Sequence, residues 1–243
     1  MDIQAQRFSR AWLEEVFSSP PRRDVARESK ATTRIPVRVP LQNCLFYADG
    51  GNEHVALLVL RHLQSIGVVR RFKSQPFYLD ELRGPVKSLP DILVELHDGS
   101  LHVIECKSKR FITDEVKERF TLERECLHHF GFGFHIWTNR DKVAQPISSG
   151  VRILDRCLSH PPPVEVIEQI RALVSPETTL GNLLSVYGLD DVLGAASVCA
   201  IHFDLRRTLH ESSPITLRPT SEYENYFFAS RHVPGGWWAS LSN

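Results

Sequence analysis

Two acidic residues and a lysine carry the most informative spacing in this sequence. Asp91 opens one apolar run, and Glu105 and Lys107 close the next one. The short segment between the runs contains Asp98-Gly99, and Asp-Gly is among the stronger short signals for a β-hairpin. In a hairpin centred there, Asp91 and Glu105 lie at the same end of the ribbon, and Glu105 and Lys107 share one face of their strand. We therefore expect two carboxylates and an ammonium group to converge at the strand ends.

This convergence predicts metal-dependent hydrolysis of a phosphodiester. Two carboxylates close together repel each other, and a divalent cation relieves the repulsion. Mg²⁺ prefers one or two carboxylates together with waters and phosphate oxygens, and we expect Mn²⁺ to substitute for it. Such a cation polarises the scissile phosphate and lowers the pKa of a bound water. Lys107 is predicted to position that water or stabilise the developing charge, and the backbone carbonyl of Cys106 is a further candidate ligand.

Glu53 is the fourth candidate catalytic residue and metal ligand. It lies in the first turn of a strongly apolar helix predicted over residues 53–63, which in a compact fold reaches the hairpin end. An alternative interpretation is that a glutamate stands there only because it interacts favourably with the helix dipole. For Asp91, Glu105 and Lys107 the alternative is a surface hairpin with an ion pair.

Other polar residues near these strands are candidate contacts to DNA. Gln75 ends a bent strand, where it is either a hydrogen-bond partner of the attacking water or a phosphate, or an ordinary polar residue before Pro76. The basic candidates, each of which has a solvated charge as its alternative, are Arg70, Arg71, Lys73, Lys87, Lys109 and Arg110.

The composition excludes several classes of protein. Of 243 residues, 42% are hydrophobic and 24% charged, so a wholly disordered or fibrous chain is excluded. The 29 basic residues balance 29 acidic ones, which argues against binding nucleic acid by bulk charge alone. No apolar run is long enough to span a membrane, and the first residues lack a secretion signal. We expect a cytoplasmic protein.

Motifs for other chemistries are missing from the sequence. The five cysteines form no short metal-ligand spacing and are expected to be separate thiols. No zinc set, no GxSxG nucleophile signature and no GxxxxGK phosphate loop occurs.

The order of predicted elements is that of a mixed α/β sheet with helices on its faces. The elements are a helix over residues 8–17, an edge strand over 35–39, the apolar helix, a bent strand over 68–79, the two hairpin strands, a helix over 114–130 capped by Thr113, and a buried strand over 132–138. Together they predict a domain over residues 41–158, preceded by an N-terminal extension over residues 1–40.

A second domain is predicted over residues 159–243, because the composition changes at the prolines 161–163. Three short helices (164–174, 180–187 and 190–199) and a strand pair that includes residues 201–205 predict a smaller, mainly helical, winged-helix-like fold. In the C-terminal tail, Trp237 and Trp238 either dock on a partner or fold back onto this domain.

The quoted residues resemble a known family. The runs 89–94, 97–99 and 103–107 resemble the PD-(D/E)xK nuclease core, and more narrowly the TnsA family of transposon-end endonucleases. Residues 74–78 resemble the family's preceding strand, 136–139 its last core strand and 201–205 a segment of its second domain. The resemblance covers residues 40–140 well and 160–220 loosely.

The resemblance implies a restriction-endonuclease-like fold and a function. The family's acidic and lysine positions match Asp91, Glu105 and Lys107, and its helix glutamate matches Glu53 within a less typical Gly-Gly-Asn-Glu-His context. By this resemblance the chain is a Mg²⁺-dependent subunit of a heteromeric transposase that cuts the 5′ strands of double-stranded DNA at transposon ends. A DDE-type transposase of the TnsB kind would process the 3′ ends, and the C-terminal domain would engage an AAA+ ATPase of the TnsC kind.

Two other functions are compatible with the same residues. One is an adaptor on a nuclease scaffold that bridges transposase and ATPase without cutting DNA. The other is a stand-alone restriction or repair nuclease with the same core.

Overall fold

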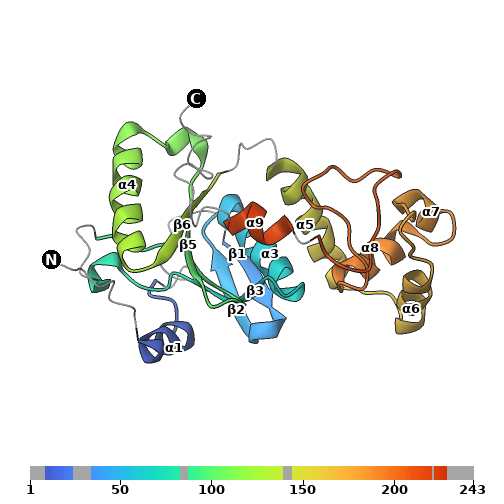
Figure 1. Ribbon diagram of the computed structural model, residues 1–243, viewed down its shortest axis with the longest axis horizontal. Coiled ribbons are helices and arrows are strands. Elements are labelled where there is room, and N and C mark those ends of the chain that lie inside the picture. The colour runs from blue at the N-terminus through green and yellow to red at the C-terminus, as the bar shows by residue number, and fades with distance from the viewer. Residues whose placement is uncertain (1–8, 24–33, 83–86, 139–143, 221, 229–243) are drawn as a thin grey trace. The chain divides into compact units, whose positions relative to one another are not determined.

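The chain divides into two compact units. The computed structural model describes residues 9–23, 34–82, 87–138, 144–220 and 222–228 (Figure 1). One unit comprises Met1–Asn139 with Glu224–Asn243, and the other is Arg140–Tyr223. Each unit is described by itself below.

A four-stranded mixed sheet forms the centre of the first unit. Its spatial order is β3-β4-β5-β6, with β3 antiparallel to β4, β4 antiparallel to β5, and β6 parallel to β5. The strands are β3 (Val69–Ser74), β4 (Ile92–Leu96), β5 (Leu101–Cys106) and β6 (Phe132–Trp137). The predicted hairpin and the predicted buried strand are both confirmed.

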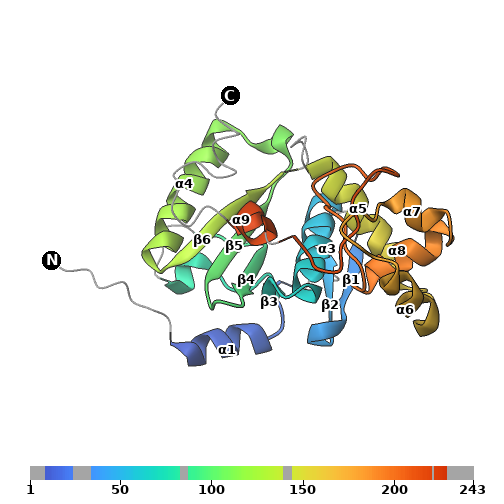
Figure 2. The ribbon, with the colours of Figure 1, turned by 45° about the vertical axis from the view of Figure 1, so that its right-hand side comes forward.

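Two long helices lie on opposite sides of this sheet (Figure 2). The helix α3 (Gly51–Ser65) precedes β3, and α4 (Asp114–His129) connects β5 to β6. The hydroxyl of Thr113 accepts a hydrogen bond from the Val116 amide, so the predicted N-cap of α4 is confirmed. The crossover through α4 makes β6 parallel to its neighbour, and the sheet is therefore mixed.

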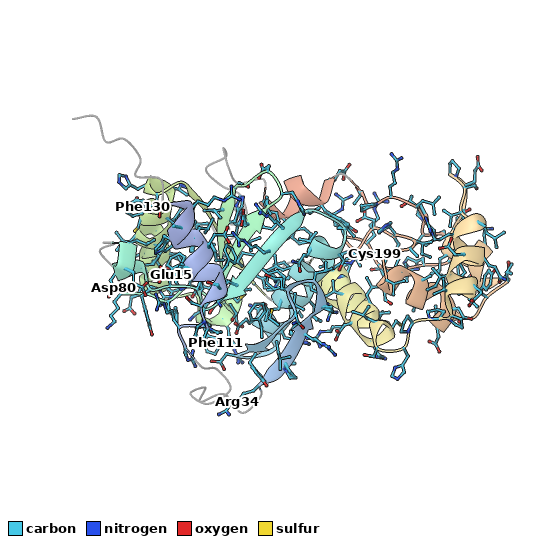
Figure 3. The ribbon with its side chains drawn as sticks, turned by 90° about the horizontal axis from the view of Figure 1, so that it is seen from below. Glu15, Arg34, Asp80, Phe111, Phe130 and Cys199 are labelled. Carbon is cyan, nitrogen blue, oxygen red and sulfur yellow. The ribbon has the colours of Figure 1, made fainter. Side chains whose placement is uncertain are left out.

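The core between α4 and the sheet also includes the short helix α1 (Arg10–Ser18). Val16 is buried in a cluster with Phe120 and Leu127 of α4, and Trp12 packs against the same cluster. Glu15, labelled in Figure 3, is exposed on the side of α1 that faces away from this core. The N-terminal helix expected from the sequence is thus part of the first unit.

Two buried histidines face each other on the other side of the sheet. His102 of β5 and His135 of β6 lie with Nδ1 and Nε2 2.9 Å apart. The ring of Phe228, from α9 (Glu222–Phe228), packs 5.0 Å from His102 and 5.7 Å from His135 between centroids. Burial lowers the pKa of His135 to about 3, so this ring is neutral at physiological pH.

Three features of the first unit differ from the expectation. The predicted edge strand is β1 (Ile35–Val39), but it pairs with an unpredicted strand, β2 (Cys44–Ala48), in a separate two-stranded sheet. The bent strand ends at Ser74, because Gln75 has a φ of 51° that takes the chain out of the β region. The short helix η2 (Leu79–Leu82) follows instead of further strand.

The second unit is mainly helical and begins before the proline run at 161–163. Its first helix, α5, packs against α8, so the unit starts ahead of the boundary expected near residue 159. Within the described residues, the expected strand pair is reduced to two isolated bridges, Thr179 with Pro214 and His202 with Thr216. The helices are α5 (Ala144–Leu158), α6 (Val164–Ala172), α7 (Leu180–Leu184) and α8 (Leu189–Ser197).

Two other expectations concern the C-terminal tryptophans and membrane-spanning helices. Trp237 and Trp238, the candidate docking residues, lie outside the described residues. No helix in the described ranges is long and apolar enough to cross a membrane.

The packing of α4 gives a test of the core assignment. Leu127 is fully buried, whereas Leu122 on the same helix is 46% exposed. We expect Leu127→Ala to lower the free energy of unfolding by about 2–5 kcal/mol and Leu122→Ala by under about 0.5 kcal/mol. Urea denaturation followed by circular dichroism measures both, and equal effects would contradict this packing.

Candidate active site

The hairpin register brings Asp91 opposite Glu105. Ile92 pairs with Ile104 and Glu95 with Leu101, and the turn uses Gly99 with a φ of 82°. One step further along the same antiparallel register, Asp91 faces Glu105 on the same side of the sheet. The two carboxylates therefore meet at the strand ends, as the sequence predicts.

Backbone hydrogen bonds fix Asp91 in this position. Its Oδ2 accepts from the Cys106 amide at 2.7 Å, and its carbonyl accepts from the Gln75 amide at 2.8 Å. Asp91 is thereby tied to both neighbouring strands. The second bond also brings Gln75, which is 2% exposed, to the same end of the sheet.

The first turn of α3 places Glu53 at this end as well. Its Oε2 accepts from the Asp49 amide at 2.6 Å. The side chain of Asn52 donates to the Trp137 carbonyl at 3.0 Å, and the Lys107 amide donates to the same carbonyl at 2.9 Å. One carbonyl at the end of β6 thus joins the start of α3 to the residue that follows β5.

Burial and mutual repulsion shift all three carboxylates in the same direction. Burial, helped by the charge of Asp91, raises the pKa of Glu53 to about 8, although hydrogen bonds from the Asp49 backbone amide and the Gln75 side chain oppose this. Burial raises the pKa of Asp91 to about 6 against the opposing Cys106 amide and Lys107 charge. Burial raises the pKa of Glu105 well above its usual range, and the charge of Asp91 adds to the rise. Asp91 is therefore close enough to both glutamates for its charge to act on them.

Glu53 carries a buried oxygen that lacks a hydrogen bond. The residue is 4% exposed, and Oε1 has no hydrogen-bond partner among the described residues. A buried carboxylate oxygen without a partner is costly. The dipole of α3 explains a glutamate in the first turn, but it does not explain this orphaned oxygen.

Sequence reasoning missed an acidic and a basic residue on α4. Arg119 lies with Nη2 3.6 Å from Glu105 Oε1 and Nε 3.2 Å from Glu123 Oε1. Glu123 is 2% exposed, and its charge contributes to the raised pKa of Glu105. The signal was present, because Glu123 interrupts the buried stripe of Phe120 and Leu127 at helical spacing.

Lys107 and Cys106 occupy positions that suit their predicted roles. Lys107 is partly buried at the mouth of the cluster, and its charge lowers the pKa of Asp91. Burial raises the pKa of the Cys106 thiol well above its usual range, so the side chain stays a neutral thiol. The role of the Cys106 carbonyl as a metal ligand stays a prediction.

Three of the candidate DNA contacts on β3 are engaged within the protein. Arg70 and Arg71 form ion pairs with Glu95 at 3.0 Å and 2.5 Å, and Arg71 also binds Glu14. Lys73 is 6% exposed and donates to the carbonyl of Ser19. The structure does not bring Arg70 or Arg71 to the carboxylates, because both lie toward the other end of β3.

The remaining basic candidates are exposed. Lys87 precedes β4, and Lys109 and Arg110 lie in the short helix η3 (Lys109–Phe111), just after Lys107. The guanidinium of Arg110 lies 4.5 Å from the ring centre of Phe111, which is 53% exposed and labelled in Figure 3. Lys109 and Arg110 follow the candidate catalytic Lys107 by two and three residues in the sequence. Their contact with DNA stays a prediction.

The donor types at this site fit a hard divalent cation. Carboxylate and carbonyl oxygens are the ligands that Mg²⁺ prefers, and the unpartnered Glu53 Oε1 is a free donor of that kind. In the described part of the chain, however, no group of three or more His, Cys, Asp or Glu side chains is arranged to hold a metal ion. A site here would thus use fewer carboxylates, completed by the Cys106 carbonyl and water, and it stays a prediction.

Comparison with known proteins adds no family to this geometry. No protein-family model matches the chain, and no curated protein matches it significantly.

Proposed function

We propose that the first unit is a Mg²⁺-dependent DNA endonuclease with a restriction-endonuclease-like core. In this proposal it hydrolyses the 5′ strands at transposon ends, as the TnsA-like motifs imply, within a heteromeric transposase. The single observation that supports the chemistry best is the convergence of the buried Glu53 and Glu105 with the half-buried Asp91 at one end of the sheet, where the charge of Lys107 also acts on Asp91.

The charge balance of the site supports a divalent cation. Five carboxylates and three basic side chains contribute to the electrostatics of this site. With all of them ionised, the site has an excess of two negative charges. One Mg²⁺ or Mn²⁺ ion would neutralise this excess. The groups are Asp49, Glu53, Asp91, Glu105 and Glu123, against Arg23, Lys107 and Arg119.

Each residue then has a definite role. Two of the three carboxylates of Glu53, Asp91 and Glu105 would hold the cation together with the Cys106 carbonyl. The cation, when bound, polarises the phosphate and acidifies water. Lys107 provides a positive charge on the same strand as Glu105, where it orients the attacking water or stabilises negative charge on the phosphate. Gln75 is positioned to hydrogen-bond the water or the phosphate. Arg119 holds the Glu105 carboxylate toward α4.

The proposed partners follow from the resemblance and from the modest charge of the chain. Double-stranded DNA is the substrate, and a net charge of zero leaves most recognition of the transposon ends to other subunits. Those subunits would be a DDE transposase of the TnsB kind and an AAA+ ATPase of the TnsC kind, which the second unit would contact. Pull-down of such a transposase separates this function from that of a stand-alone nuclease.

The first prediction concerns the charge of Asp91. Asp91→Asn keeps an oxygen that accepts from the Cys106 amide but removes the negative charge. We expect it to leave the fold intact and to slow cleavage of supercoiled plasmid in Mn²⁺ on the order of 10³-fold. Lys107→Ala is expected to abolish cleavage in the same assay.

Asp98→Asn is the matched control, because it makes the same change at the turn end of the same hairpin. It should cleave like the wild type. Undiminished cleavage by Asp91→Asn would reject this site. A wild-type protein that neither cleaves nor binds Mn²⁺ in isothermal titration would favour the non-cleaving adaptor.

The second prediction concerns pH. In the metal-free protein Glu53 retains its proton up to a pKa of about 8, against an ordinary value of 4.5. The folded state therefore binds more protons than the unfolded state between these values, so the free energy of unfolding falls as pH rises through them. We expect Glu53 to contribute a loss on the order of 3 kcal/mol between about pH 5 and pH 8.

The comparison with Glu53→Gln isolates this effect. His135, with its pKa lowered to about 3, gives the opposite slope below its unfolded pKa of about 6.5, and both proteins share that slope. Thermal unfolding should show a flatter pH dependence in Glu53→Gln. Saturating Mg²⁺ should stabilise the wild type more at pH 8 than at pH 5, because the cation binds the deprotonated form. Equal pH profiles of the two metal-free proteins would contradict the assigned burial of Glu53.

A further inference from the structure

The segment Ser19–Arg23, which follows α1, is held against the candidate site. The carbonyl of Ser19 accepts from the buried Lys73 ammonium, and the Arg22 amide donates to the Gln75 carbonyl at 2.9 Å. The Arg22 side chain pairs with Glu81 at 2.8 Å. These contacts fasten the segment to the end of β3 and to η2.

The same segment brings a second arginine to the carboxylates. Arg23 Nη2 lies 2.8 Å from Asp49 Oδ2, and the Asp49 amide is the group that donates to Glu53. The positive charge of Arg23 also lowers the pKa of Asp91, as does that of Lys107. Arg23 and Lys107 therefore approach the same carboxylate from different elements.

The two neighbouring arginines have different surroundings. The Arg22 side chain binds Glu81 of η2, away from the buried carboxylates, and the segment keeps its two backbone anchors without Arg23. The Arg23 side chain is about one-third exposed, and its contact with Asp49 uses one nitrogen of the guanidinium. The described residues give no partner to its other nitrogens, and a guanidinium presents several donors in a fork that matches phosphate.

A phosphate approaching this site needs positive charge at its rim. The buried carboxylates repel a phosphodiester, and one divalent cation only balances their excess charge. Lys107 is one cation at the rim, and Arg23 is another, carried there by the N-terminal extension.

We propose that Arg23 is a substrate-positioning residue, which binds a DNA backbone phosphate adjacent to the scissile one, and that the anchored segment before it only carries it to the site. This inference rests on the proposed nuclease function and gives the N-terminal extension a role in it. It makes Arg23 a contact to phosphate and Arg22 a structural residue.

Arg23→Ala and Arg22→Ala test the proposal as a matched pair. Binding is measured on a fluorescent DNA duplex, with both substitutions made in the full-length Asp91→Asn protein, and cleavage is measured without Asp91→Asn. We expect Arg23→Ala to weaken duplex binding about tenfold and to lower the slope of log K against log salt by about one. It should raise KM for cleavage with Mn²⁺ affinity unchanged, and Arg23→Lys should recover part of the loss. Arg22→Ala should match its parent in all of these measurements.

Two outcomes would overturn the inference, and both differ from a failure of the proposed function. If the wild type cleaves and Arg23→Ala binds duplex as tightly as Arg22→Ala, Arg23 does not contact phosphate. If Arg23→Ala instead loses Mn²⁺ affinity while its salt slope is unchanged, it acts through Asp49 on the carboxylates. A wild type that neither binds nor cleaves duplex would reject the nuclease proposal itself.

Discussion

Burial of like charges is the constraint on which the rest of this structure depends. Glu53 comes from the first turn of α3, Asp91 from the residue before β4, and Glu105 from β5. Within this low-dielectric interior, the charge of Asp91 raises the pKa of both glutamates. Removing carboxylates from water and placing them together is unfavourable on both counts. A fold that serves stability alone gains nothing from this arrangement, whereas a site that binds a cation requires it.

The scaffold holds these groups chiefly with backbone atoms. The backbone amides of Cys106 in β5 and of Gln75, just after β3, donate to Asp91 and fix it. The Trp137 carbonyl joins the start of α3 to the residue that follows β5. Because the β6 strand runs parallel to β5, the carboxyl ends of both strands meet at the same edge. The apolar core between α4 and the sheet packs the strands that lead to that edge.

Much of this arrangement could be predicted from the sequence because its signals are local. The Asp98-Gly99 turn sets the hairpin register, and that register alone places Asp91 opposite Glu105. The Thr113 cap and the apolar spacing of α4 are likewise short-range signals. For the same reason, the order of elements from α3 to β6 was predicted correctly.

The rest depended on tertiary contacts that no local pattern encodes. The β2 strand was not predicted, although it buries Phe46 and Ala48 in the same alternating pattern as β1; its pairing with β1 in a separate sheet is the tertiary contact that was missed. The end of β3 at Gln75 follows from a positive φ at a residue other than glycine. Arg23 and Asp49 are 26 residues apart in the chain. They meet because Ser19 is anchored to β3 and Arg22 to the residue that follows it.

The most direct test of the account is a crystal of this protein soaked in Mn²⁺ and examined by anomalous diffraction. We predict one strong peak at the strand ends, about 2.0–2.3 Å from oxygens of Asp91 and Glu105 and from the Cys106 carbonyl, with Lys107 beside it. The absence of a peak there, with the Asp91 and Glu105 carboxylates turned away from each other, would contradict the account.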